Sequence, residues 1–103
     1  MRTVHEVLKM LMSRFREEKV AQVEGYNKFE YIRETNKAVI VGRENGSEAR
    51  VPFSTIENAI QAVRNDHYVY DGGPVRLRVY GITHVNSPVW AILHLAELSE
   101  LLE

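Results

Sequence analysis

Two arginines and a tyrosine alternate with apolar residues in the segment Val75-Arg76-Leu77-Arg78-Val79-Tyr80. If the segment is a β-strand, Arg76, Arg78 and Tyr80 project from one face, because side chains alternate between the two faces of a strand. Arginine contacts phosphate oxygens and tyrosine stacks on bases. The pattern predicts a nucleic-acid-binding face that also includes Arg50. The alternative is a solvated strand face whose arginines pair with glutamates.

Four histidines are the residues best suited to acid–base or metal chemistry: His5, His67, His84 and His94. Their spacing matches no metal-binding signature. His67 and His84 can converge with Asp71 near the ends of the 75–80 segment and act as an acid–base pair, but no nucleophile motif accompanies them. The sequence therefore predicts no catalytic residue, no metal and no cofactor.

The last predicted helix is apolar around most of its circumference from Val89 to Leu102. Asn86-Ser87-Pro88 begins it, with Ser87 as the N-cap and proline at the first helical position. Such a helix needs cover on several sides, and a second copy of the chain is an economical cover. Either the helix is buried in its own domain, with Trp90 as a core anchor, or it forms a homodimer or partner interface. The interface residues would be Trp90, Leu93, His94, Leu98 and Leu101.

Periodicity predicts the elements that position these residues. Thr3 and Glu6 form a capping box before a helix over about residues 4–20, in which apolar residues recur at helical spacing. Alternation with a period of two then predicts three consecutive antiparallel strands between residues 29 and 53. The second and third strands are joined by a tight hairpin at Asn45-Gly46, and Pro52 suits an edge or a strand end.

The second half of the chain begins with another capping box, Ser54 to Glu57, which opens an amphipathic helix. Asp71-Gly72-Gly73-Pro74 is a turn rather than a phosphate loop, and a fourth strand over 75–80 follows it. The order α-β-β-β-α-β-α predicts a single α+β domain over residues 1–103. In this domain an antiparallel sheet of three to five strands packs on two or three helices.

Composition limits the functional classes. The chain has 103 residues, of which 45% are hydrophobic, which is enough for a core without a disulfide or metal. It has no cysteine, which excludes thiolate chemistry, and no signal-peptide core or long apolar run, so we expect a cytoplasmic protein without membrane contact. The net charge of −1 provides no global attraction to nucleic acid, although nine of the thirteen basic residues are arginine.

The leading hypothesis is a small non-enzymatic binding module that binds nucleic acid and self-associates through apolar helices. The alternative is a protein-interaction or small-ligand-binding accessory domain, and an enzyme built on histidine and aspartate ranks last. In the alternative, aromatic side chains line a pocket or groove: Tyr26, Phe29, Tyr31, Tyr68 and Tyr70.

Overall fold

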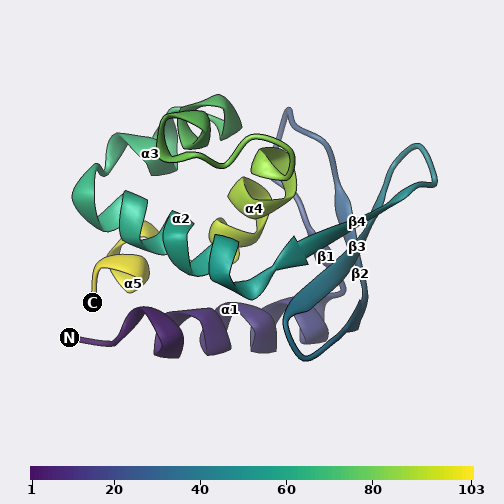
Figure 1. Ribbon diagram of the computed structural model, residues 1–103, viewed down its shortest axis with the longest axis horizontal. Helices are drawn as coiled ribbons and strands as arrows, with labels where there is room; N and C mark the ends of the chain where they lie inside the picture. The colour runs from purple at the N-terminus through teal and green to yellow at the C-terminus, as the bar shows by residue number, and fades with distance from the viewer.

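An antiparallel sheet with helices on one side forms the architecture of the computed structural model, which describes residues 1–103 (Figure 1). The predicted α+β class is confirmed. The elements are α1 (Val4–Glu18), β1 (Val20–Ala21), β2 (Phe29–Glu34), β3 (Ala38–Arg43), β4 (Glu48–Pro52), α2 (Phe53–Asn65), α3 (Tyr68–Asp71), the 3-10 helix η1 (Pro74–Tyr80), α4 (Asn86–Leu93) and α5 (Leu98–Leu102). No helix is both long enough and apolar enough to span a bilayer.

The sheet has the strand order β1-β2-β3-β4, and each neighbouring pair is antiparallel. Val39 pairs with Val51, and both side chains are fully buried against the helices. Ile40 pairs with Arg50 on the outer face, where no helix lies (Figure 1). Gly46, with a φ of +88°, forms the predicted turn between β3 and β4. Pro52 ends the edge strand β4, where its missing N–H breaks no ladder bond.

Helix α1 begins at the predicted capping box. The Thr3 hydroxyl accepts a hydrogen bond from the Glu6 N–H at 3.1 Å, and the Glu6 carboxylate accepts one from the Thr3 N–H at 2.9 Å. The apolar stripe that follows is buried: Val7, Leu8, Leu11, Met12 and Phe15. The stripe therefore packs α1 into the core, and the helix ends at Glu18, close to the predicted boundary.

The predicted strand over 75–80 is wrong, because this segment is the 3-10 helix η1. Gly73 and Gly81 flank it with φ values of +85° and +82°, which turn the chain into and out of the helix. Only Leu77 of its three alternating apolar residues is buried, whereas Val75 and Val79 are 58% and 76% exposed. The fourth strand of the sheet is instead the short β1.

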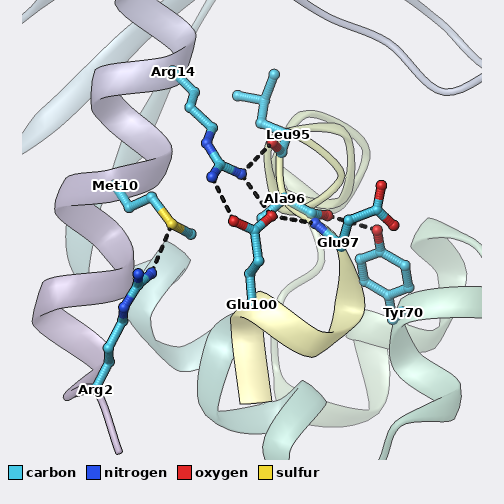
Figure 2. A network of polar contacts seen from close by, with 8 residues as sticks. All are labelled: Arg2, Met10, Arg14, Tyr70, Leu95, Ala96, Glu97 and Glu100. Atoms are coloured by element: carbon cyan, nitrogen blue, oxygen red, sulfur yellow. Dashed lines mark hydrogen bonds and ion pairs between the residues drawn. The ribbon is translucent and has the colours of Figure 1, made fainter. Parts of the chain in front are cut away.

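The predicted helix over 89–102 is also corrected, because the chain breaks into α4 and α5 between residues 94 and 97. Glu97 and Glu100 form a capping box at the start of α5. Neither Ser87 nor Ser54 caps a helix, because α4 begins one residue before Ser87 and α2 one residue before Ser54, and neither start has a side-chain cap. Arg14 of α1 contacts the chain on both sides of this break. Its guanidinium donates hydrogen bonds to the Leu95 carbonyl at 3.0 Å and to the Glu100 carboxylate (Figure 2).

Candidate functional site: a polar cleft

The largest hollow in the molecule is a polar cleft of about 510 Å³ between the strand ends, η1 and the start of α4. Arg43, Arg78 and His84 supply its basic side chains, and Glu44 is its one acidic residue. The other polar side chains are those of Asn27, Asn45, Thr83, Asn86 and Ser87. Phe29 is the only large apolar residue in the lining. The cleft therefore suits a polar or charged ligand.

Strand register places the sheet side of the cleft. Phe29 pairs with Arg43 at the ends of β2 and β3, so both side chains project from the inner face of the sheet. Phe29 is buried and Arg43 is exposed, because the helical layer ends at this point. The other wall comes from the last turn of η1, with Arg78, and from the first turn of α4. The Asn86 side chain donates to the Pro74 carbonyl at 3.1 Å and ties these two helices together.

The cleft carries two guanidinium groups and one carboxylate, that of Glu44, so its formal charge is +1. Five ion pairs occur in the protein, and none of them includes Arg43 or Arg78. The Glu44 carboxylate already accepts a hydrogen bond from the Lys28 backbone N–H at 2.6 Å. No side chain caps the N-terminus of α4, where the helix dipole adds partial positive charge. Two guanidinium groups and several amide and hydroxyl groups can therefore contact an anion that also has hydrogen-bonding groups.

The structure separates the four residues predicted to bind nucleic acid. Arg78 lines the cleft. Arg76 lies over the Tyr68 ring at 4.5 Å, with its guanidinium 3.6 Å from the Asp66 carboxylate. Tyr80 is 38% exposed at the end of η1 and does not line the cleft, and Arg50 lies on the outer face of the sheet. The common strand face is absent because a 3-10 helix has three residues per turn.

The residues predicted to form an oligomer interface are packed within one chain. Trp90 is 3% exposed, and Leu93 and Leu101 are fully buried. Leu98 packs against the same core and is partly buried. The His94 ring stacks on Tyr70 at 3.8 Å, and its Nε2 lies 2.8 Å from the Tyr70 carbonyl oxygen. Because a single chain already covers them, their apolar character no longer requires a second copy.

Burial lowers the pKa of His94, although the hydrogen bond with the Tyr70 carbonyl opposes that shift. The neutral ring is therefore favoured near neutral pH, which suits a core position. His84 lines the polar cleft, but His67 and Asp71 belong to the α3 region and do not line it. No group of three or more histidine, aspartate or glutamate side chains is placed to hold a metal ion.

Sequence reasoning missed Arg43 and the asparagines of the cleft. A signal for Arg43 existed, because Thr35-Asn36-Lys37 has the composition of a turn. Residues equally distant from Asn36 pair across that hairpin, which places Arg43 opposite Phe29. The asparagines come from separate segments that meet only in the folded chain. Phe29 is the only one of the five aromatic residues in the predicted pocket that lines the cleft.

Comparisons with protein-family models, curated proteins and solved structures found no match for this chain. The fold and the cleft therefore define the class, which is an α+β domain with a cationic polar cleft at one end of its sheet.

Proposed function

We propose that this protein is a non-enzymatic module that binds nucleic acid by holding phosphate groups in the polar cleft. The observation that carries the proposal is the pair of arginines, Arg43 and Arg78, which line one cleft from two elements and have no carboxylate partner. A guanidinium group without an internal partner is available to a phosphate, for which its planar fork of donors is well suited.

The concave shape of the cleft favours a single strand over a duplex. A volume of about 510 Å³ is in the range of small-molecule sites and can admit a nucleotide unit of a flexible strand. Asparagine side chains carry both donors and acceptors, so Asn27, Asn45 and Asn86 can bond the edge of a base. Phosphates on a rigid duplex, in contrast, lie on a convex surface and do not reach far into a cleft.

The net charge of −1 makes the attraction local, so the affinity depends on a few contacts. Two phosphate contacts predict a slope of about −1.4 in a plot of log K against log salt for a single strand. Raising salt from about 50 to about 200 mM then weakens binding about sevenfold. A steeper slope would indicate contacts outside the cleft.

Fluorescence anisotropy with mixed-sequence single-stranded and duplex oligonucleotides tests this function. We expect Arg43→Ala and Arg78→Ala each to weaken single-strand binding about tenfold and to lower the salt slope by about 0.7. Arg50→Ala is the matched control, because Arg50 is also exposed and outside every ion pair but lies on the outer face of the sheet. The proposal fails if no oligonucleotide binds at low salt, or if Arg50→Ala is as damaging as the cleft variants.

Self-association is a second candidate property, and the exposed valines of η1 favour it. Val75 and Val79 are 58% and 76% exposed, and they are the most exposed aliphatic side chains in the protein apart from Met1. A homodimer would cover them, whereas the helix residues at 90–101 are already covered. Sedimentation velocity over a range of micromolar concentrations tests this: the mass should rise with concentration in the wild type and stay monomeric in a Val75→Ser/Val79→Ser variant. A wild type that remains monomeric contradicts it.

A further inference from the structure

A second depression runs along α1 and is separate from the polar cleft. It consists of two overlapping hollows of about 470 and 310 Å³ that share His5, Leu8, Asn36 and Phe53. Helix α1 borders it on one side, and the β2–β3 turn and the first turn of α2 border it on the other. We call this depression the α1 groove.

The floor of the α1 groove is apolar and its rim is charged. Leu8 and Met12 belong to the apolar stripe of α1, and Phe53 is the first residue of α2. Phe53 is only partly buried, although it packs against the core. Leu8 and Met12 are only 5% and 3% exposed, so among these three residues it is mainly Phe53 whose apolar surface a partner's side chain would remove from water, which is favourable.

The two carboxylates of the rim each have a contact within the protein, but only that of Glu34 is with an arginine. Glu34 is 2.6 Å from the Arg16 guanidinium and also accepts a hydrogen bond from the Tyr31 hydroxyl. Glu57 is 3.2 Å from His5 Nδ1, a contact that is an ion pair only when the imidazole is protonated.

The positive charges that remain are on opposite walls of the groove. Lys9 on α1 and Lys37 in the β2–β3 turn line the two hollows and take part in none of the five ion pairs. With Lys9, Arg16 and Lys37 against Glu34 and Glu57, and histidine counted as neutral, the groove has a formal charge of +1 and a free lysine on each wall.

We propose that the α1 groove binds an acidic peptide segment of a partner protein, with one bulky apolar side chain over Leu8, Met12 and Phe53 and carboxylates beside Lys9 and Lys37. Charge complementarity identifies the occupant, because the groove is net positive and Lys9 and Lys37 have no contact with a carboxylate. The open, elongated shape suits a chain segment, since a small molecule is normally enclosed on most sides by its site.

This site is independent of the nucleic-acid proposal. Lys37 immediately precedes β3 and Arg43 is its last residue, so the two sites lie at opposite ends of a six-residue strand. At the usual rise of a strand, this separation is roughly 20 Å. One occupant can therefore bind in the α1 groove while another binds in the cleft.

A random peptide library displayed on phage and selected on the full chain tests the proposal. We expect the enriched peptides to share a bulky apolar residue with acidic neighbours and to bind the Lys9→Glu/Lys37→Glu variant about tenfold more weakly. A Lys28→Glu/Arg50→Glu variant carries the same charge change away from the groove and should bind them normally. Enriched peptides synthesised with lysine in place of their acidic residues should bind the Lys9→Glu/Lys37→Glu variant, which shows that this variant is folded.

Three results would overturn the proposal. The first is a selection that enriches no peptide, and the second is a set of enriched peptides that are not acidic or that bind both double variants equally. The third is a dimer, seen by sedimentation, that Lys9→Glu/Lys37→Glu abolishes and Val75→Ser/Val79→Ser does not, which would place a second copy of the chain in the groove. Amide chemical-shift changes on adding an enriched peptide should centre on Leu8, Met12 and Phe53, and changes centred elsewhere would also count against the site.

Discussion

At the scale of single residues, Arg14 and Glu100 form the best-developed polar contact in the molecule. The Arg14 guanidinium donates to both oxygens of the Glu100 carboxylate at 2.8 and 2.5 Å and to the Leu95 carbonyl at 3.0 Å (Figure 2). The hydrogen bond from Arg14, with a second from the Glu97 N–H, lowers the pKa of Glu100 from 4.5 to about 2. The ionised carboxylate is therefore favoured more strongly in the folded chain than in the unfolded one.

The Glu100 pKa predicts a pH dependence of stability. Between pH 4.5 and about 2 the unfolded chain binds more protons at this residue than the folded chain does, so this contribution to stability is complete above pH 4.5 and is lost as the pH falls through about 2. Because the pair is partly exposed, we expect Glu100→Gln to lower the free energy of unfolding at neutral pH by about 1 kcal/mol.

Urea unfolding at several pH values checks this prediction. The difference between the wild type and Glu100→Gln should shrink as the pH falls through the window between 4.5 and about 2. Glu17→Gln is the control, because Glu17 is exposed and belongs to no ion pair. A difference that stays constant down to the acid end would show that the charge of Glu100 does not contribute.

At the scale of elements, the two predicted capping boxes have different outcomes, which gives a direct test. Thr3 caps α1 through its hydroxyl, whereas Ser54 lies inside the first turn of α2 and makes no cap hydrogen bond. We expect Thr3→Ala to lower the free energy of unfolding by about 1 kcal/mol and Ser54→Ala to change it by less than about 0.5 kcal/mol. Denaturant unfolding of both variants measures the two costs. Equal costs would mean that the Thr3 hydrogen bond is not formed in solution.

The turn that ends η1 gives a second prediction at this scale. Gly81 has a φ of +82°, and a Cβ added there would meet no atom within 4 Å. Gly81→Ala should therefore destabilise the fold through backbone conformation alone, by about 1–2 kcal/mol. Thermal unfolding followed by circular dichroism measures it. If Gly81→Ala leaves the midpoint of thermal unfolding unchanged, the chain can adopt a different turn after η1 without losing stability.

The elements that could be predicted were those with long or redundant signals. Helix α1 has four turns of apolar spacing and a cap, and β3 and β4 have an Asn-Gly turn between them. The 75–80 segment has only six residues, and over that length the alternation of Val75, Leu77 and Val79 does not distinguish a strand from a short helix. Gly73 and Gly81, whose positive φ values turn the chain into and out of η1, and Pro74 at the start of η1 favour the helix over the strand. The break between α4 and α5 was hidden because apolar residues continue on both sides of it.

The candidate site depends on pairing across the chain, so only part of it could be predicted. Arg78 was identified from its own segment and does line the cleft, although on a helix rather than a strand. Arg76 has the same residue type two positions earlier, but it packs on Tyr68 near Asp66. No local pattern distinguishes these two arginines. Their different surroundings depend on where η1 lies against α3 and α4.

At the scale of the whole molecule, one hydrophobic core of 26 residues joins helices from both ends of the chain to the sheet. The two termini lie side by side (Figure 1). The Arg2 N–H donates a hydrogen bond to the Glu103 carbonyl. Arg64 of α2 donates to the Leu101 carbonyl at 2.8 Å, and Arg14 of α1 holds Glu100. The last helix therefore bridges α1 and α2 and closes the core at the end opposite the sheet (Figure 1).

This closure predicts that α5 and the rest of the core unfold together. Leu101 is fully buried, so Leu101→Ala removes apolar contacts and leaves a cavity, which should cost about 2–5 kcal/mol. Trp90 is the one tryptophan and lies in the same core, so its fluorescence reports on core packing, while far-UV circular dichroism reports on the helices. In both the wild type and Leu101→Ala, the two probes should give coincident urea transitions, with the midpoint lower in the variant. Helical signal lost before the Trp90 signal changes would instead show that α5 opens independently, and the core would then not depend on its last helix.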